Sequence, residues 1–321
     1  MSQASDSVLR MTTDDRYRVS NSEIQTFKMC KRRWWLAYYR RLRPVLEKRS
    51  GPLTLGTNVH AALEAHYGLE PIDPVQVIHD VYAAQRQSAV DAEDFDALVQ
   101  INKDADLALA MIEGYIEWVA ETGIDDDLEV VSVEEEIAVD LEAVPVTIIG
   151  KLDTRVRRHS DGALLSMDHK TCASIEGLAK TFELAEQPLM YHLLERLHSP
   201  DEERVTGGLY NMLRKVKRTA NAKPPFYARE YVHHNEEQLR NFWTRLHGEL
   251  MDIVRTHEAL DGGLDPHQVV YPTPSGDCSW KCEFRAVCPL FDDGSNAEGV
   301  LSSAYKVHNP YERYNTTEVT L

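Results

Sequence analysis

The sequence predicts an α/β fold in which a central mixed β-sheet is flanked by helices, with a helical N-terminal part and a C-terminal cysteine-rich loop that closes onto it. Helix-type spacing of apolar residues dominates positions 20–122. Runs rich in valine and isoleucine then alternate with helical patterns as far as residue 260, which indicates one sheet between helices. The last part, 261–321, is loop-rich and holds three of the five cysteines.

The N-terminal part is expected to be mostly helical after a flexible segment, 1–19. Ser20 and Glu23 have the spacing of a capping box, which marks the start of the first helix. Pro44 follows the end of that helix, and Gly123 is a stop signal for the last one. The four expected helices are 20–41, 53–67, 73–90 and 95–122.

The sheet is expected to begin after residue 125. Alternating apolar and charged residues predict strands, and Asp161-Gly162 is a pair that favours a hairpin turn. The helices 179–198 and 235–260 complete the pattern, and the N-terminal helices are expected to cover one edge of the sheet. The expected strands are 128–141, 144–158, 163–168, 205–213 and 226–233.

The charge of the chain is unevenly distributed. A formal net charge of −17 over 321 residues counts against a nucleic-acid partner, because phosphate binding starts from a basic field. Residues 28–49, however, hold nine Lys or Arg and one Glu, a local net of +8. Phosphate contact needs only such a local patch, since salt screens charges over about 8 Å. The composition therefore weakens the case for nucleic acid without excluding it.

The apolar residues predict an ordinary globular protein. Hydrophobic residues make up 43% of the chain and charged residues 27%, which excludes a disordered or fibrous class. No run approaches 18 apolar residues, and the opening MSQASDSVLRMTTDD lacks the apolar stretch of a signal peptide. We therefore expect neither membrane association nor export, and a cytoplasmic location.

The strongest local feature is a pair of motifs on consecutive strands, Gly150-Lys151-Leu152-Asp153 and Asp168-His169-Lys170. Adjacent antiparallel strands can bring Asp153 and Asp168 to the same end of a sheet, where two carboxylates suit Mg²⁺ or Mn²⁺. Lys170 faces the same side as Asp168, because side chains alternate along a strand. It could orient a water or stabilise a phosphate. The alternative is a solvated ion pair at the strand ends.

The cysteines form a second group. Cys278, Cys282 and Cys288 have the spacing C-x3-C-x5-C, and Cys30 lies far before them in the sequence. Four thiolates can converge there only if the two ends of the chain meet. Such a set suits zinc or a [4Fe–4S] cluster, and the spacing alone does not separate the two. Cys172 is left out and is expected to be a packed thiol.

Taken in order, these motifs resemble the PD-(D/E)xK nucleases of the RecB-like group. That group includes the AddB nuclease domain and CRISPR-adaptation exonucleases that carry an iron–sulfur cluster. The resemblance spans residues 22–290 and rests on five separated elements. They are the basic-aromatic helix with Cys30, Gly56-Thr57-Asn58-Val59-His60, the paired aspartate motifs, Gln187-Pro188-Leu189-Met190-Tyr191, and the C-terminal cysteine triplet.

The resemblance implies a restriction-endonuclease-like core and a role for each motif. His60, Asp153 and Asp168 would bind the catalytic Mg²⁺ or Mn²⁺, helped by the backbone carbonyl of His169, and Lys170 would position or activate the attacking water. Gln187 and Tyr191 would contact the nucleic-acid backbone, and Pro188 requires their helix to begin or kink near Gln187. The alternatives are a buried core histidine for His60 and simple helix-to-sheet packing for Tyr191.

For the cysteines, the resemblance implies a [4Fe–4S] cluster bound by Cys30, Cys278, Cys282 and Cys288, with zinc as the alternative. Its expected role is structural, because it would hold the N-terminal helix against the C-terminal loop. The corresponding segments are a helical region 20–124 that carries Cys30 and His60, a nuclease core 125–260, an iron–sulfur loop 261–292 and a polar tail 293–321.

Basic residues near aromatic ones indicate where nucleic acid could bind. Trp34, Trp35, Tyr38 and Tyr39 alternate with arginines, as in proteins that stack bases on rings and pair phosphates with cations. We expect these aromatic residues to be mostly core and the basic side chains to face DNA, although solvated arginines are the alternative. The expected contacts are Lys31, Arg32, Arg33, Arg40, Arg214, Lys215 and Lys217, with Arg218 in the same basic stretch as the last three.

The function implied by the resemblance is a metal-dependent DNA exonuclease that acts on single strands or at DNA ends, in recombination, repair or DNA processing. A homo-oligomer, or a recombination or CRISPR protein, is the expected partner besides DNA. Two alternatives remain: a catalytically silent DNA-binding or CRISPR-interfering homologue, and a zinc-stabilised scaffold protein. The presence of all four core residues, His60, Asp153, Asp168 and Lys170, argues against both.

Overall fold

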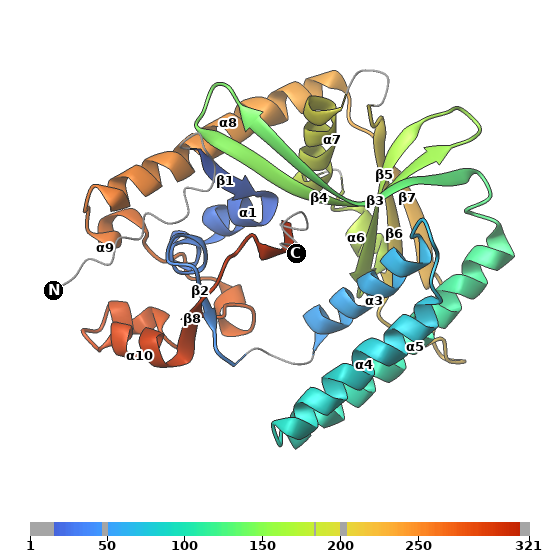
Figure 1. Ribbon diagram of the computed structural model, residues 1–321, viewed down its shortest axis with the longest axis horizontal. Coiled ribbons are helices and arrows are strands. Elements are labelled where there is room, and N and C mark those ends of the chain that lie inside the picture. Colours follow the sequence, from blue (N-terminus) through green and yellow to red (C-terminus); the bar gives the residue numbers. More distant parts are fainter. Residues whose placement is uncertain (1–15, 47–50, 183, 200–203, 315–321) are drawn as a thin grey trace, which may run out of the picture. The chain divides into compact units, whose positions relative to one another are not determined.

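Six strands form one mixed β-sheet in the computed structural model, which describes residues 16–46, 51–182, 184–199 and 204–314 (Figure 1). They are β1 (Tyr17–Ser20), β3 (Leu128–Leu141), β4 (Val146–Arg158), β5 (Leu164–Cys172), β6 (Gly207–Arg214) and β7 (Tyr227–Val232). The order is β1-β4-β5-β6-β7, and β3 also pairs with β4. The pairs β1–β4 and β5–β6 are parallel, whereas β4–β5 and β6–β7 are antiparallel. The predicted α/β fold with a mixed sheet is confirmed.

Helices flank this sheet, and their ends carry the predicted signals. The Ser20 hydroxyl accepts a hydrogen bond from the Glu23 backbone N–H at 3.3 Å. Gly123 has a φ of 61° directly after one helix, a left-handed conformation that glycine adopts without strain. The helices are α1 (Asn21–Met29), α2 (Lys31–Trp34), α3 (Pro52–His66), α4 (Pro74–Asp91), α5 (Phe95–Thr122), α6 (Ile175–Ala179), α7 (Glu186–His198), α8 (Glu236–Asp261), α9 (Pro266–Val269) and α10 (Ala297–Ala304). None of them, within the described residues, is long and apolar enough to cross a membrane.

The chain divides into two compact units that differ from the predicted segments. The first unit combines Met1–Glu47, Glu136–Gly150 and Arg240–Leu321, and the second combines Lys48–Glu135 and Lys151–Leu239. The first helices of the segment 20–124 fall in the first unit, with the C-terminal part of the chain, and its later helices fall in the second unit. Contacts of this kind, between segments far apart in sequence, leave no local pattern.

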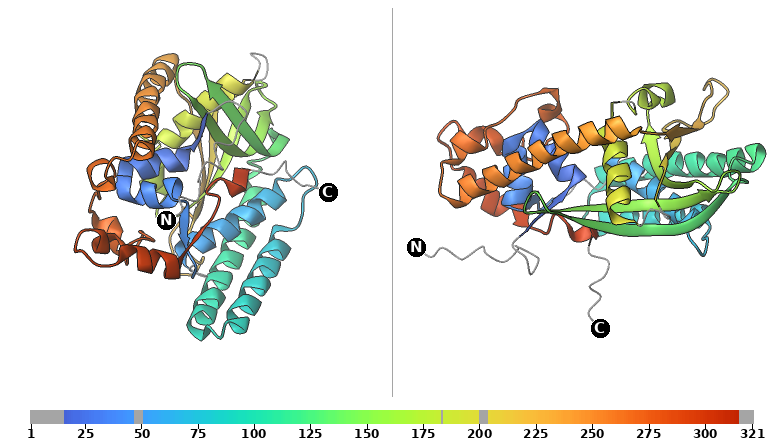
Figure 2. Two further views of the ribbon diagram at one scale, coloured as in Figure 1. Left: turned by 60° about the vertical axis from the view of Figure 1, so that its left-hand side comes forward. Right: turned by 90° about the horizontal axis from the view of Figure 1, so that it is seen from above.

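In the second unit, helices cover both faces of β5, β6 and β7. Buried residues of α3, α4 and α5 pack against one face, and α4 and α5 run side by side (Figure 2). On the other face, Ile175 of α6 and Phe182 pack against Tyr210 and Met212. The strand residues on the first face are Val156, Leu165, Met167, Leu209, Leu213 and Tyr227. Neighbouring residues of β5 and β6 therefore point to opposite helical layers.

In the first unit, the predicted helix 20–41 is interrupted at Cys30. The backbone there is extended, with φ of −161° and ψ of 111°, so α1 ends and α2 begins at this residue. A π-helical turn, Trp35–Tyr39, follows α2. Cys30 therefore lies between two helices and not in the middle of one. Its sulfur accepts a hydrogen bond from the Thr273 backbone N–H at 3.5 Å.

Both chain ends contain structure that the sequence did not predict. Residues 17–19 of the predicted flexible segment belong to β1, while 1–15 lie outside the described residues. The described part of the predicted polar tail includes α10 and β8 (Tyr305–Val307), which pairs antiparallel with β2 (Leu42–Pro44). Tyr311 also donates a hydrogen bond to the buried Glu23 carboxylate. Strands of three or four residues are too short for a periodic signal, so only pairing reveals them.

Candidate functional site

Asp153 and Asp168 lie next to each other at the end of the β4–β5 pairing. The last aligned pair is Thr154 with Met167, so each aspartate is the next residue on its strand. The two carboxyl groups share a hydrogen bond. On the other side, β5 continues its pairing with β6 as far as Cys172. The two acidic side chains thus lie at the point where β5 stops pairing with β4 and continues to pair only with β6.

Helix α3 brings His60 to the same place. The His60 Nε2 atom lies 2.7 Å from Asp153 Oδ2, and its Nδ1 atom lies 2.9 Å from Glu64 Oε1. Among the described residues, His60, Glu64 and Asp153 form the one group whose possible ligand atoms all lie within 4.8 Å of one another. Nitrogen and carboxylate donors of this kind suit Mn²⁺ or Mg²⁺. Glu64 was not among the residues predicted from the sequence, although its spacing of four from His60 puts both on one helical face.

Lys170 completes the cluster. Its ammonium nitrogen lies 2.5 Å from Asp168 Oδ2, and both side chains are on the same face of β5. All the residues of this cluster belong to the second unit. The structure therefore brings together the four predicted residues His60, Asp153, Asp168 and Lys170 from α3, β4 and β5, and adds Glu64.

Burial and proximity set the charges of the cluster. Burial raises the pKa of Asp168 to about 6; the Lys170 charge opposes this rise, and the Asp153 charge reinforces it. Burial opposes the charge of Asp153 too, but hydrogen bonds from His60 and Asp168 hold its pKa below the ordinary value. For His60, the bonds to Asp153 and Glu64 outweigh burial and raise the pKa to about 10. Without a metal, a proton on His60 balances the carboxylates, and a divalent cation can replace it.

The raised pKa of His60 predicts a pH dependence for the metal-free protein. The folded pKa of about 10 lies above the ordinary 6.5, so protonated His60 stabilises the fold fully below pH 6.5. This stabilisation is lost as the pH rises from about 6.5 to 10. In EDTA, His60→Gln should therefore cost unfolding free energy at pH 6 and progressively less towards pH 10, as measured by urea denaturation. The exposed His79 of α4 supplies the control His79→Gln. A cost that does not change with pH would contradict the assignment.

Helix α7 presents its predicted residues to the face of β4 that carries Asp153. Gln187 and Tyr191 are half-buried and, with Glu195, are spaced four apart on one helical face. Glu195 is 0% exposed and accepts a hydrogen bond at 3.0 Å from Nε of Arg155, which is on the same face of β4 as Asp153. Burial raises the pKa of Tyr210 of β6, and the charges of Asp168 and Tyr191 raise it further. The sequence analysis missed the Arg155–Glu195 pair.

Pro188 affects α7 as the sequence predicted. The helix begins at Glu186, so Pro188 lies in its first turn, where the missing N–H breaks no helical bond. The predicted start at residue 179 is wrong, because the preceding segment forms the separate helix α6. Gln187 therefore lies at the N-terminal end of α7.

In the first unit, the four predicted cluster cysteines are all half-buried. The charge of Cys30 affects the pKa of Cys288, and the charge of Cys278 affects that of Cys282. Burial raises the pKa of both Cys282 and Cys288. The two ends of the chain do meet here, as convergence of the four thiols requires. Cys172 belongs to the second unit and is not part of the set.

Donors surround these sulfur atoms. The Ser275 backbone N–H donates to Cys278 at 3.4 Å, and Arg32 Nη1 lies 4.0 Å from the Cys288 sulfur. Two sulfur atoms on one zinc ion are at most about 4.6 Å apart, because each Zn–S bond is about 2.3 Å. No three of the four cysteines lie within 4.8 Å of one another.

Arg32 and Arg33 of α2, and Arg40 after it, form ion pairs within the first unit. Arg32 is 4% exposed and forms two hydrogen bonds with Asp292, at 2.6 and 3.0 Å. Its burial does not agree with the predicted phosphate contact. Arg33 pairs with Glu283 at 2.8 Å and Arg40 with Glu298 at 2.7 Å, while Lys31 lies over the rings of Phe27 and Tyr271. These ion pairs join the N-terminal helices to the C-terminal segment.

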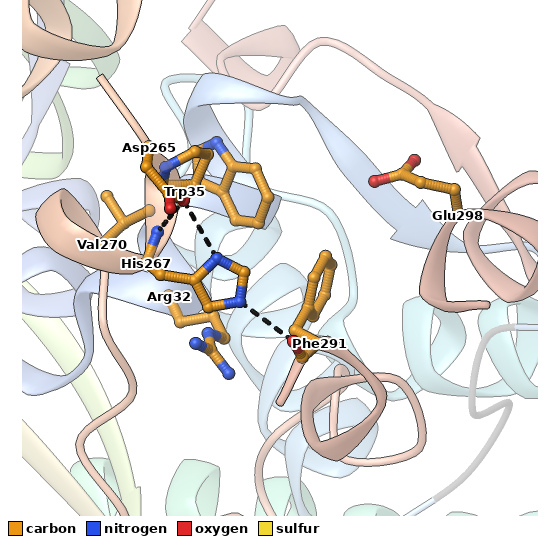
Figure 3. A pocket seen from close by; sticks show the side chains of 8 residues that line it. Arg32, Trp35, Asp265, His267, Val270, Phe291 and Glu298 are labelled. Atoms are coloured by element: carbon orange, nitrogen blue, oxygen red, sulfur yellow. Dashed lines mark hydrogen bonds and ion pairs between the residues drawn. The ribbon is translucent and has the colours of Figure 1, made fainter. Parts of the chain in front are cut away.

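Arg32 also lines a pocket of about 270 Å³ beside this segment (Figure 3). The pocket has aromatic walls from Trp35 and Phe291. His267 bonds Asp265 through Nδ1 and the Phe291 carbonyl through Nε2, at 3.0 and 2.9 Å. These polar groups are thus used in holding the pocket walls together.

The second basic stretch connects β6 to β7 and is also largely paired. Lys217 lies 3.5 Å from Asp106, and Arg218 bonds Glu117, both acids being on α5. Arg214 donates to the Lys223 carbonyl at 2.9 Å. Burial lowers the pKa of Lys215, which lies beside Cys172. The acidic α5 thus neutralises part of the predicted basic patch.

Trp34 and Trp35 are buried, as predicted for the aromatic residues of this segment. Trp34 packs edge-on against Phe27 and donates to Glu23 at 2.9 Å. The sequence analysis missed Trp280, which is 68% exposed and lies between Cys278 and Cys282 with Lys281 beside its ring. A signal existed, because the aromatic and basic neighbours Trp280-Lys281 repeat the pattern sought in α2.

Comparison with known families identifies the class of protein to which this fold and site belong. The chain belongs to the PD-(D/E)XK nuclease superfamily, whose family model matches residues 18–289. A candidate exonuclease from Eubacterium rectale has a TM-score of 0.45 and 12% identity, and the match covers 88% of this chain and 98% of the other. A crystal structure described as SSO0001 has a TM-score of 0.29 and 16% identity, over 66% and 84% of the two chains. No curated protein sequence matches the chain.

Proposed function

We propose that this nuclease-superfamily protein is a Mg²⁺- or Mn²⁺-dependent exonuclease that hydrolyses phosphodiester bonds in single-stranded DNA or at DNA ends, in recombination, repair or DNA processing. One observation carries the proposal: His60, Asp153, Asp168 and Lys170 meet in one cluster in which the half-buried Asp153 carboxyl lies beside the buried Asp168 carboxyl. Burying two such groups side by side is costly unless a cation balances them. A surface ion pair would not need this arrangement.

Each residue of the cluster has a role that follows from its position. His60, Asp153 and Asp168 would hold the ion, with the Glu64 carboxylate beside His60 as an additional donor. A divalent ion held there supplies Lewis-acid polarisation of a phosphate and lowers the pKa of bound water. The Lys170 ammonium, now paired with Asp168, would orient the attacking water or offset the charge of the phosphate. Gln187 and Tyr191 would contact the DNA backbone from α7.

DNA contact in the first unit is proposed for a narrower set than the sequence indicated. Trp280 and Lys281 combine an exposed ring with a cation, which suits stacking of an unpaired base. Lys31 already contacts an aromatic ring, and Arg33 and Arg40 are already in ion pairs. These three residues could contact phosphates only with the donor groups that these interactions leave accessible. Buried Arg32 is left out of the proposal.

Digestion of end-labelled DNA tests the proposed function. Single-stranded and blunt double-stranded substrates are incubated with the protein in Mg²⁺, Mn²⁺ or EDTA, and the products are followed in time on denaturing gels. We expect shortening from the labelled or unlabelled end in the presence of metal and intact DNA in EDTA. Binding without cleavage would instead identify a catalytically silent DNA-binding protein. Cleavage that begins inside a circular single strand would exclude an exonuclease.

We also propose a [4Fe–4S] cluster on Cys30, Cys278, Cys282 and Cys288. Four half-buried thiols in one compact unit, with backbone N–H donors to the sulfur atoms of Cys30 and Cys278, support this proposal. Protein purified without oxygen should contain about four iron atoms per chain and a broad absorption band near 400 nm. Cys288→Ser should lose both, whereas Cys172→Ser, outside the set, should keep them. Stoichiometric zinc without iron would refute the cluster and favour the zinc-stabilised alternative.

A further inference from the structure

Behind the metal cluster, a buried hydrogen-bonded network reaches His169 from the opposite side of β5. Its centre is Arg229 of β7, whose side chain is 0% exposed and lies 2.6 Å from the Asp125 carboxylate. Arg229 also donates to the hydroxyl groups of Tyr67 and Tyr115, at 3.2 and 3.3 Å. Its Nε atom donates to Asn211 Oδ1 at 2.6 Å. All of these residues belong to the second unit.

The network fixes the orientation of the Asn211 amide. An arginine can only donate hydrogen bonds, so the oxygen of Asn211 must face Arg229 and its NH₂ group must face the other way. That NH₂ group lies 3.1 Å from the Met167 sulfur and 3.2 Å from Nδ1 of His169. Asn211 is 0% exposed, so water cannot replace these partners. Every polar atom of the amide is thus in use.

The amide in turn fixes the tautomer of His169. Because Asn211 donates to Nδ1, that nitrogen must be an acceptor, and the ring proton must be on Nε2. The Nε2 atom is buried and has no hydrogen-bond partner within the described residues. A buried donor without an acceptor costs free energy. The Asn211 NH₂ group excludes the other tautomer, because an Nδ1–H would place two donors against each other.

The ring of His169 is also held on its faces. It stacks on Tyr67 with ring centres 5.3 Å apart and an angle of 21°, and it meets the His60 ring nearly at a right angle, with centres 5.6 Å apart. The residues on either side of His169 are Asp168 and Lys170. Pairing of β5 with β4 has ended by this point, whereas His169 is still aligned with Asn211 of β6. The side chain at position 169 therefore helps to fix a segment supported by one neighbouring strand.

We propose that Asn211, oriented by Arg229, is a positioning residue for the metal site: it locks the His169 ring and thereby the backbone that carries Asp168 and Lys170. The inference rests on the proposed function, because it assigns a purpose to the same cluster. Asn211 touches no reacting group and acts through His169. Hydrogen-bond partners of residues beside a metal site commonly change metal affinity or activity about 10- to 100-fold when replaced.

The substitution Asn211→Asp tests the proposal. Aspartate has nearly the same shape and still accepts from Arg229, but it has no hydrogen to donate to His169. The proton of His169 should then move to Nδ1, which long-range ¹H–¹⁵N NMR of the ring detects in metal-free protein. Mn²⁺ affinity, measured by calorimetry, should fall about 10- to 100-fold. In DNA cleavage, kcat should fall while KM for DNA stays unchanged.

Tyr115→Phe is the matched control. It removes two hydrogen bonds of the same network, those of the Tyr115 hydroxyl with Arg229 and with Tyr67, without touching Asn211. It should lower the melting temperature but keep Mn²⁺ affinity and the Nε2–H tautomer. Equal losses of Mn²⁺ affinity in both variants would reduce Asn211 to a structural residue, and unchanged affinity in Asn211→Asp would overturn the proposal. If Asn211→Asp does not fold, ring NMR of the wild-type protein still tests the proposal. An Nδ1–H tautomer of His169 in the wild type would by itself overturn the proposal.

The two proposals can fail separately. If the wild-type protein binds Mn²⁺ at the His60 and Asp153 site but cleaves no DNA, the proposed function is wrong, and the Asn211 variant still tests positioning through NMR and calorimetry. If the protein cleaves DNA and Asn211→Asp behaves as the wild type, only the positioning inference is wrong.

Discussion

Asp153→Asn and Lys170→Ala should each abolish metal-dependent DNA cleavage while the protein remains folded. Asp153 is the carboxylate that contacts both His60 and Asp168, so its loss removes a charge from the centre of the proposed metal site. Lys170 is the one cation of the cluster that a metal would not replace. Loss of several kcal/mol of transition-state stabilisation corresponds to a fall in kcat/KM of about a thousandfold or more. Initial rates with end-labelled single-stranded DNA measure it.

The same two changes differ in their effect on metal binding. Asp153→Asn should weaken Mn²⁺ binding in calorimetry, whereas Lys170→Ala should keep or strengthen it, because a positive charge near the cation is removed. Asp161→Asn and Lys180→Ala are matched controls, since both residues form exposed ion pairs with near neighbours in sequence. They should cleave as the wild type. Wild-type cleavage by either site variant would falsify the proposed catalytic cluster.

Glu195→Ala should be strongly destabilising. Glu195 is 0% exposed and neutralises Arg155, which is 10% exposed and also bonds Ser199 at 3.1 Å. Truncating the glutamate leaves a buried guanidinium without its counter-charge, and breaking a buried pair in this way costs about 3–5 kcal/mol. Urea denaturation at pH 7 measures the loss. Since α7 carries Gln187 and Tyr191, partial detachment of this helix should also raise KM for DNA.

A second variant separates the charge from the packing. Replacing both partners, as in Arg155→Met with Glu195→Leu, leaves no unpaired charge and should recover most of the stability lost in Glu195→Ala. The exposed pair Arg158–Asp161 on the neighbouring turn gives the comparison, because Asp161→Ala should change stability little. If Glu195→Ala and Asp161→Ala were equally mild, the Arg155–Glu195 pair would not hold α7 to the sheet.

Sequence reasoning succeeded where the signal is local. The bounds of α5 and β3 agree with the predicted segments 95–122 and 128–141, because long periodic runs with clear end signals determine their own structure. It also placed Asp153 and Asp168 on adjacent antiparallel strands and found the spacing that puts Lys170 on the same face as Asp168. His60, by contrast, was selected by the resemblance of its motif, since a lone helical histidine has no local signal for a ligand.

The basic segment 28–49 shows where local signals mislead. Its charge of +8 suggested a DNA-binding surface, but Arg32, Arg33 and Arg40 are paired with acids more than 240 residues later in the chain. A count of charges cannot distinguish a residue that faces solvent from one that holds a distant segment. Glu64 and the Asn211–Arg229 network were not predicted for the same reason. Their roles depend on contacts with residues of other helices and strands.

The sequence by itself determined the class of fold, the helices and strands with strong periodicity, and the chemical types available for a metal site and a thiolate site. Those properties depend on residue type and on spacing of two to four residues. The tertiary structure alone decided which charges are neutralised, that Glu64 joins His60, that α7 is held through Arg155 and Glu195, and that His169 is locked by Asn211. The physical reason is that hydrogen bonds and ion pairs act over about 3–4 Å in space, whatever the separation along the chain.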